Sequence, residues 1–514
     1  MDNRIKYRRP IIALLVGAAS LAAPPALADD LRDALAAAYR TNPTLQSARA
    51  QQRAVDETVP IARSQGLPSL GGTANYTETL KASDNNRILG TVVGPDRVLD
   101  LAATASYPVF SGGAVRNAIN AAETRVKAGQ SDLRAVETGV FSQTTAAYMD
   151  VIQNEAIVGL NRNNVQVLEV NLKATRDRYE IGDLTRTDVA QSEARLAQAR
   201  SDLRAAEANL AGSRETYIRF VGKPAADLQP PPPLPGMPAT PEEAVAMALD
   251  NNPDLRAEHE RSRAARFDSK AAGAGRLPKV SVFVSADRTD YLGSYTSNPA
   301  GFPLVTDKPI TAQAGVRATI PLFQGGLPAA QQRQAQARES AQLESEIATE
   351  REVIATVRTY YQQWQAAQAI IVSSQAAVDA AALGLEGVRA ENSVGTRTIL
   401  DILNAEQELL NAQTVLVRAR RNAYVAGFNL IAAMGRATAA DLGLDAGPLY
   451  DPQANYKRVR GMIFDWEHDP SPIARSTRTV DTPAQTGTIS DAAAEALRPA
   501  GMQTMSGQTR SGGK

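Results

Sequence analysis

The feature that most constrains the fold of this chain is an internal repeat. Asn42-Pro43 recurs as Asn252-Pro253, and Leu67-Pro68 recurs as Leu277-Pro278, each 210 residues later. Further along, the same residues recur at an offset of 213, in the pairs Pro108 and Pro321, Tyr148 and Tyr361, Gly182 and Gly395, Asp188 and Asp401, and Gly222 and Gly435. The change of offset places three additional residues in one loop. We therefore predict a duplication in which each half builds the same unit.

Each half is predicted to hold a helix, two strands joined by a loop, a long helix and a further helix. The first helix runs from residue 30 to about residue 65, where Leu67-Pro68 ends it. Four runs alternate apolar with polar residues, at 70–76, 99–107, 280–287 and 312–320. Such alternation over about ten residues is typical of a transmembrane barrel strand. For any single run, a soluble sheet with one solvent-exposed face is the more common explanation. Four runs in an exported chain favour a barrel.

Export itself is predicted from the N-terminus. Residues 4–9 are rich in Arg and Lys, residues 11–23 are apolar, and Ala26-Leu27-Ala28 supplies a small-x-small cleavage site before Asp29. These are the three regions of a secretory signal peptide, and an uncleaved anchor is the alternative. No later stretch approaches the ~20 apolar residues of a membrane helix. A membrane crossing would therefore have to use strands.

Two segments, residues 113–180 and 327–392, contain no proline after Pro328 and little glycine. At 1.5 Å per residue, a helix over either segment would be on the order of 100 Å long. The helices that follow carry seven-residue seams, at Ile402, Leu409, Leu416, Ala423 and Leu430 with Ala405, Ala412, Ala419, Ala426 and Ala433, and at Val189, Leu196, Leu203, Leu210 and Tyr217 with Ser192, Ala199, Ala206, Ser213 and Phe220. Such heptads predict closely packed, left-handed coiled coils.

These patterns divide the chain into five parts. Residues 1–28 form the signal peptide, 29–222 the first repeat and 241–440 the second. Between the repeats, the proline-rich segment 223–240 is predicted to be a stiff, extended surface linker. From residue 441 to 514 the periodicity ends in Gly, Ser, Thr, Pro and charged residues, which predicts a disordered tail.

Composition argues against several classes of function. Lys and Arg total 55, as do Asp and Glu, so no net charge attracts the chain to nucleic acid. Cysteine is absent, which excludes disulfides, thiolate sites and a lipidated N-terminal cysteine. The two histidines, His259 and His468, lie far apart, and neither a metal-ligand spacing, a Gly-x-Ser-x-Gly motif nor a P-loop is found. We predict no enzyme activity, catalytic residue, metal or cofactor.

Four strands are too few to close a barrel in lipid, because an open sheet leaves unpaired backbone groups there. Two copies would supply eight strands with a filled interior, and three would supply twelve around a water-filled lumen. A polar inner face favours three. The predicted fold is thus an α+β membrane protein, a homotrimeric twelve-stranded β-barrel continuous with a long α-helical coiled-coil barrel. A structural periplasmic coiled-coil or adaptor protein is the alternative, but it would not need lipid-compatible strands.

One motif resembles a known family. The run from Ser393 to Leu403, SVGTRTILDIL, is very similar to the periplasmic-end motif of the TolC family of outer-membrane channels. Val109-Phe110-Ser111-Gly112-Gly113 and Leu322-Phe323-Gln324-Gly325-Gly326 resemble that family's strand-to-helix junctions. The resemblance, over about residues 29–440, implies a homotrimer in outer-membrane lipid that serves type I protein secretion, multidrug efflux or both. It also implies a periplasmic adaptor and an inner-membrane transporter of the ABC or RND type as partners.

The resemblance further implies a gate at the periplasmic end of the helices. By position, Arg397 would be the donor of a lock, Asp188 its acceptor, and Asp401 a member of an acidic ring. Two positions depart from the family pattern: Asn404 replaces the second acidic residue of the ring, and Asn392 replaces a tyrosine of the lock. The ring would then carry one carboxylate per chain and bind cations less strongly. An ordinary i,i+4 pair on a solvated helix is the alternative for Arg397 and Asp401.

Overall fold

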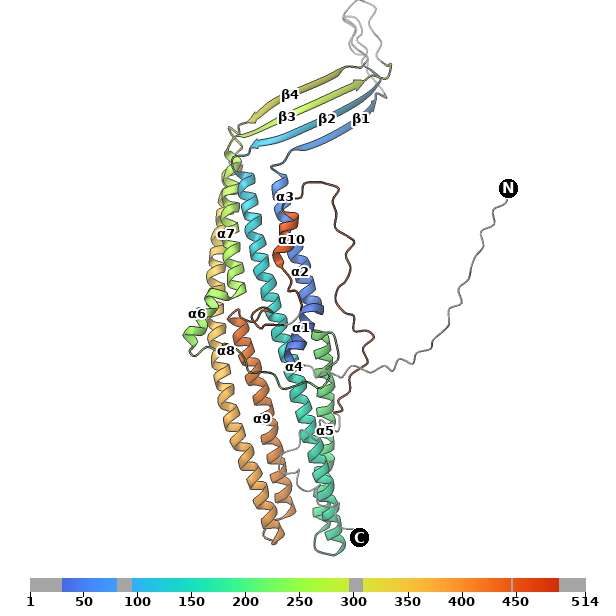
Figure 1. Ribbon diagram of the computed structural model, residues 1–514, viewed down its shortest axis with the longest axis vertical. Helices are drawn as coiled ribbons and strands as arrows, with labels where there is room; N and C mark the ends of the chain where they lie inside the picture. The colour runs from blue at the N-terminus through green and yellow to red at the C-terminus, as the bar shows by residue number, and fades with distance from the viewer. Residues whose placement is uncertain (1–29, 81–94, 295–307, 445–446, 490–514) are drawn as a thin grey trace, which may run out of the picture.

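The computed structural model describes residues 30–80, 95–294, 308–444 and 447–489. A small sheet lies at one end of a bundle of long helices, and two helical hairpins form the opposite end (Figure 1). The predicted signal peptide, parts of both strand-to-strand loops and the last residues of the tail lie outside the described residues.

The four predicted strands form one antiparallel sheet in the order β1-β2-β3-β4. Their bounds are Ser69–Glu78 (β1), Arg97–Phe110 (β2), Lys279–Asp290 (β3) and Ile310–Thr319 (β4). The register aligns two rows across the sheet, one of Leu70, Ala105, Val284 and Ala314 and the next of Gly71, Thr104, Ser285 and Gln313. Because directly paired residues share a face of a sheet, the apolar positions of all four strands lie on one face. The predicted alternation is confirmed.

The helix predicted over residues 30–65 is divided into α1 (Leu31–Thr41), α2 (Pro43–Asp56) and α3 (Thr58–Ser64). The first break arises because Asn42 has extended backbone, and its Oδ1 accepts hydrogen bonds from the amides of Thr44 and Leu45. Pro43 then begins α2, where its missing N–H is not needed. The second half repeats this break at Asn252, between α6 (Pro241–Asn251) and α7 (Pro253–Gly273).

The two predicted long helices are confirmed as α4 (Ala114–Glu180) and α8 (Leu327–Ser393), each 67 residues long. Both begin directly after a glycine pair with positive φ, Gly112-Gly113 before α4 and Gly325-Gly326 before α8. The helices α5 (Arg186–Val221) and α9 (Ile399–Ala433) return from the far end of the bundle. None of the predicted seam residues on α5 and α9 is exposed.

The main core lies midway along the bundle, where both halves meet. Its largest fully buried side chains include Phe141, Tyr148, Tyr217 and Phe428. The proline-rich segment 223–240 has neither helix nor strand and is tied to this region by tyrosine hydroxyls. Tyr148 donates to the carbonyl of Gln229, Tyr361 to that of Ala239 and Tyr424 to that of Pro232, at 2.6, 2.8 and 3.0 Å.

The prediction of a disordered tail is wrong for the described residues beyond 440. A short helix, α10 (Pro452–Val459), packs on α2, and Asn455 donates to Asp56. Farther on, Arg214 donates to the carbonyls of Thr486 and Thr488, at 2.6 and 3.0 Å. The tail is held by separate contacts, which include these hydrogen bonds and the buried side chains of Val459 and Ile489, rather than by a continuous apolar stripe, so its order leaves no periodicity in the sequence.

Helix α8 differs from the expectation that no later segment is apolar enough to cross a membrane. Among the described residues it is the one helix that meets a length and composition test for such a span, and only 11% of its apolar window is buried. The buried residues of the whole helix are Val353, Val357, Tyr361, Ala367, Ser374 and Leu385. Most of α8 therefore presents an uncovered surface in a single chain.

Candidate functional site

The predicted gate residues lie at the two hairpin turns farthest from the sheet, α4–α5 and α8–α9 (Figure 1). The turns have the same geometry. Gly182 and Gly395 each adopt φ +83°, and each amide donates to the carbonyl three residues earlier, that of Tyr179 or Asn392, at 3.0 Å. A left-handed residue of this kind ends a helix at low cost when it is glycine.

Asp188 and Asp401 occupy equivalent positions in these turns, as capping residues of α5 and α9. The Oδ2 of Asp188 accepts from the backbone amide and hydroxyl of Thr185, at 2.9 and 2.7 Å, and Asp401 repeats both distances with Thr398. Hydrogen bonds from the hydroxyl and amide of Thr185 lower the pKa of Asp188. The amide and then the hydroxyl of Thr398 lower the pKa of Asp401. Both carboxylates are therefore charged at neutral pH.

Arg397 pairs with Glu391 within the chain. Its Nε lies 2.7 Å from Glu391 Oε2, and both side chains are about half exposed. Asn392 donates from Nδ2 to the carbonyl of Arg397, at 2.7 Å. Among the described residues of one chain, no hydrogen bond or ion pair joins Arg397 to Asp188. The structure thus places both residues at the same end of the molecule but does not bring them together.

Asn404 takes part in a contact that the sequence did not indicate. Its Oδ1 accepts from Arg195 Nη2 at 2.7 Å, which joins α9 to α5. Because α5 belongs to the first repeat and α9 to the second, this hydrogen bond links the two hairpins close to their tips. An aspartate at this position would make the link an ion pair, so the asparagine weakens it.

Glu406 is a residue of this end that sequence reasoning missed. Its carboxylate accepts from Asn171 on α4 and from Arg389 on α8, both at 2.9 Å, and its side chain is only 5% exposed. Leu403 and Leu410 are buried on the same face of α9. The sequence signal was the position of Glu406 between Leu403 and Leu410 on one face of the helix. The predicted heptad seam at Ala405 and Leu409 gave no reason to expect Glu406 to be buried.

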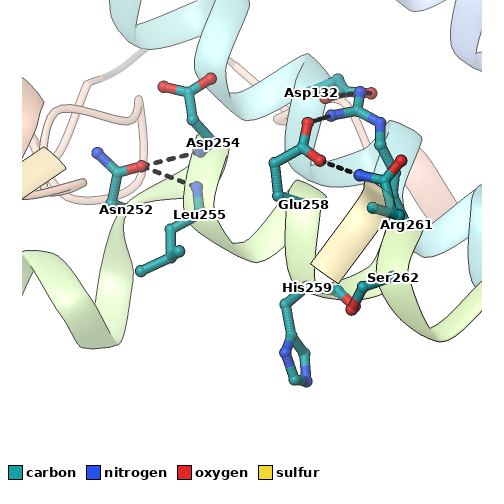
Figure 2. A network of polar contacts seen from close by, with 9 residues as sticks. Asp132, Asn252, Asp254, Leu255, Glu258, His259, Arg261 and Ser262 are labelled. Atoms are coloured by element: carbon teal, nitrogen blue, oxygen red, sulfur yellow. Dashed lines mark hydrogen bonds and ion pairs between the residues drawn. The ribbon is translucent and has the colours of Figure 1, made fainter. Parts of the chain in front are cut away.

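A second polar network joins the halves nearer the sheet, where α7 lies against α4 (Figure 2). Arg261 Nη2 donates to both oxygens of Asp132 at 2.7 Å, and its Nη1 donates to Glu258 at 2.7 Å. Burial raises the pKa of the adjacent Asp254, and the charge of Asp132 adds to the effect. Arg261 thus links α7 to α4 through Asp132.

The chemistry of these sites is that of helix capping and of links between helices. Among the described residues, no group of three or more His, Cys, Asp or Glu side chains is arranged to hold a metal ion. His259 bonds Glu346 on α8 at 2.8 Å, and His468 lies exposed in the tail. The geometry favours links that hold the two hairpins together.

Comparisons with known proteins find relatives over most of the chain. The family model described as "Outer membrane efflux protein" matches residues 34–223 and 244–436. The outer membrane efflux protein BepC of Brucella suis is 33% identical over 453 residues, which cover 88% of this chain and 95% of BepC. The outer membrane protein TolC of Escherichia coli is 26% identical over 430 residues, covering 81% and 84% of the two chains.

Solved structures show the same fold. The outer membrane protein VceC of Vibrio cholerae aligns with a TM-score of 0.67 at 22% identity, over 79% of this chain and 96% of VceC.

Proposed function

Because the chain belongs to the outer membrane efflux protein family, we propose that three copies form one duct through the outer membrane and across the periplasm. The protein itself is an outer-membrane channel component for efflux or secretion. The proposed assembly is a homotrimer with a twelve-stranded barrel and a gate at its helical end. A periplasmic adaptor without a barrel would not account for the family match or for the two-faced sheet.

The open sheet carries this proposal most directly. In the described chain, β1 and β4 each have one neighbouring strand, so each leaves one edge unpaired. The apolar face suits lipid and the polar face suits water, but an unpaired edge in lipid is prohibitively costly. Pairing β1 of one copy with β4 of the next removes both edges. Three copies give twelve strands, which is wide enough for a water-filled lumen.

The helices support the same assembly. Helix α8 lies at the β4 side of the chain and is largely uncovered, with Val372 and Leu383 among its exposed apolar residues. A neighbouring copy joined through the sheet would lie against this surface. At ~1.5 Å per residue, the 67-residue helices then form a tube about 100 Å long, long enough to reach far into the periplasm.

The proposal includes an origin by duplication. The order of elements in the first half recurs in the second, with α7 in place of α2 and α3, and the bounds of α4 and α8 differ by the same 213 residues as the sequence repeat. The family model also matches once in each half. A duplicated unit in three copies supplies six similar units around the duct, which suits a nearly uniform ring of helices.

We place the gate at the hairpin turns. Asp188 and Arg397 are exposed enough at these turns to reach a neighbouring copy, and Arg397 would exchange Glu391 for Asp188 when the tube closes. Three copies of Asp401 would form a ring of negative charge at the same end. The links of Asn404 to Arg195 and of Asn392 to the backbone of Arg397 stay within one chain.

The partners follow from the resemblance of the motif at 393–403 to the TolC family. A periplasmic adaptor would grip the hairpin end, and an inner-membrane transporter of the ABC or RND type would supply the energy. The cargo, whether protein, small molecule or both, is a property of that transporter, because the duct itself offers only a polar passage.

The test is the assembly of the purified, membrane-extracted protein. We expect a band of three chains on an unheated denaturing gel, which collapses to one chain on heating, and ion conductance in planar bilayers. A protein that is monomeric in detergent under all mild conditions and makes no channels would overturn the proposal.

A further inference from the structure

The tail contains a segment, residues 461–475, that is held at both ends and is largely exposed between them; we refer to it as the arm. On one side, Val459 is buried and Arg63 Nη1 donates to the carbonyl of Arg460 at 3.0 Å. On the other side, Thr477 packs so closely against Gly222 that a Cβ there would lie 2.7 Å from the threonine hydroxyl. The two anchors hold the arm at the level of the upper helices.

The arm exposes large apolar side chains. Trp466 is 94% exposed, Ile473 85%, Phe464 71% and Ile463 58%. The polar contacts of the arm are local, to α10 and to itself, such as the ion pair of Asp469 with Arg458 at 2.8 Å. A cluster of this kind on a tethered segment marks an interaction surface.

The arm leaves the molecule on the side away from α7 and α8. Helix α4 contacts α2 and α3 on one side and α7 on the other, and α8 lies beyond α7. In Figure 1 the tail rises along α3 and then extends outward from it, away from α7. Since α3 ends five residues before β1 begins, the arm starts beneath the β1 edge of the sheet.

Closure of the barrel determines which helices of the next copy lie beside the arm at the β1 edge. When β1 pairs with β4 of the next copy, the helix that follows β4, α8, comes beside α3 and α10, with α7 one helix farther. The width of one α-helix is about 10 Å, and the six residues 461–466, which follow the anchor at Arg460, can extend up to ~20 Å. The arm can therefore cross α8 of the neighbour and reach its α7.

The charges of the two surfaces are complementary. The arm exposes the carboxylates of Asp465 and Glu467, and also Asp469, which pairs with Arg458 of its own chain. Helix α7 exposes Arg256, Arg263, Arg266 and Lys270 on one face, where Arg263 also pairs with Glu260. Arg256 and the tail residues Leu449 and Tyr450 line the same cavity, so this basic face lies on the outward side on which the tail runs. The same carboxylates disfavour an anionic lipid surface as the occupant.

We propose that the arm binds the outer surface of α8 and α7 on a neighbouring copy of this chain, so that each copy clasps the next. This rests on the proposed trimer, because the neighbour is present only if the sheets join. The apolar residues of the arm cover α8, and its carboxylates pair with the basic face of α7. The tail thus adds a second interface beneath the membrane to the one between strands.

The test uses paired cysteines in the full-length protein, which contains no cysteine of its own. A Trp466→Cys, Lys270→Cys double variant should give bands of two and three chains on a denaturing gel after treatment with a short bis-maleimide. Each single variant should give none. Asp465→Lys with Glu467→Lys should lower the yield several-fold, and Arg263→Glu with Arg266→Glu in that protein should restore it.

The matched control pairs Trp466→Cys with Lys127→Cys, on the exposed side of α4 in the same chain. Cross-linking within one chain by this pair, without bands of two chains from the first pair, would show that the arm folds back and would overturn the proposal. Quenching of a fluorophore on Trp466→Cys by brominated phospholipid, again without cross-links, would overturn it in favour of the membrane. A three-chain band on an unheated gel, without cross-links from the arm, would show that the trimer forms and would overturn only the proposed contact of the arm with its neighbour. The absence of any trimer would overturn both.

Discussion

Glu406 Oε1 lies 2.9 Å from Arg389 Nη2, with the glutamate nearly buried and the arginine half exposed. Asn171 Nδ2 donates to both oxygens of the same carboxylate, at 2.9 and 3.1 Å. One carboxylate therefore ties α4, in the first repeat, to α8 and α9, in the second. Because Glu406 is buried and Arg389 is half exposed, removal of the arginine leaves a buried charge, whereas removal of the glutamate leaves a half-exposed one.

Arg389→Ala should destabilise the helical end more than Glu406→Gln does. The first variant leaves a buried carboxylate with one amide partner, at a cost of about 2 kcal/mol, whereas the second leaves only a half-exposed guanidinium. Thermal unfolding of the purified protein, followed by circular dichroism, measures the difference. Glu408→Ala, at an exposed position of the same helix, is the control and should match the wild type. Equal losses from Arg389→Ala and Glu408→Ala would contradict the role of the link.

The hairpin turns should respond to acid in a defined direction. Hydrogen bonds from Thr185 and Thr398 lower the pKa values of Asp188 and Asp401 from the ordinary value of 3.8. Their contribution to stability is therefore complete above pH ~3.8 and is lost as the pH falls through the lower folded-state pKa values. Channel conductance should be steady from pH 7 to 5 and rise only below pH ~3.8.

Removal of a capping hydroxyl should reproduce that acid effect at neutral pH. Thr185→Ala removes an N-cap worth about 1 kcal/mol, so the α4–α5 turn should loosen and conductance should rise at pH 7. Thr185→Ser keeps the hydroxyl and serves as the control. If the alanine variant conducts like the wild type at every pH, the caps do not hold the closed state.

Variants of Arg397 and of its partner within the chain, Glu391, should have different effects if the proposed gate exists. Arg397→Ala and Asp188→Ala should raise conductance, since each removes one side of the lock between copies. Glu391→Ala should lower conductance or leave it unchanged, because it frees Arg397 for Asp188. Asp401→Ala should instead reduce cation selectivity, as it removes the ring charge. Increased conductance in Glu391→Ala would show that the pair within one chain is itself the lock.

Single cysteines should distinguish the two faces of the sheet. The polar-face positions Thr73, Thr104, Ser285 and Thr319 should react with water-soluble maleimides through the lumen, and the apolar-face positions Ala74, Ala105, Val284 and Ala318 should not. The register already places these sets on opposite faces. Equal labelling of both sets in intact membranes would mean that the sheet does not form a barrel wall.

The lower part of the tail should detach when Gly487 gains a side chain. A Cβ at this position would overlap with the carbonyl oxygen of Glu207, a backbone atom that cannot move aside. Gly487→Ala should therefore expose the tail to proteases, which limited trypsin digestion measures. Gly461→Ala, where a Cβ meets nothing within 4 Å, is the control. Equal resistance of the two variants would show that the tail is not docked on α5.

The sequence by itself determined the elements and their faces. Alternation at period two, heptads at 3.5 and long runs without proline are local properties, because the geometry of a strand or a helix decides which side chains share a face. The two long helices, the four strands and the matching turns at Gly182 and Gly395 follow from them. The position of each proposed gate residue on its hairpin follows as well, since capping involves neighbours along the chain.

Only the tertiary structure decided which distant groups meet. The sequence placed Arg397 near Asp188 through a resemblance, but within the chain the closer Glu391 holds it, since an ion pair forms with whatever carboxylate geometry brings within reach. The burial of Glu406 depends on Asn171 and Arg389, which stand far apart in the sequence from each other. The tail lacks any periodic pattern, yet Arg214 and Gly222 order it, because a single hydrogen bond or close contact depends on three-dimensional position and leaves no repeat in the sequence.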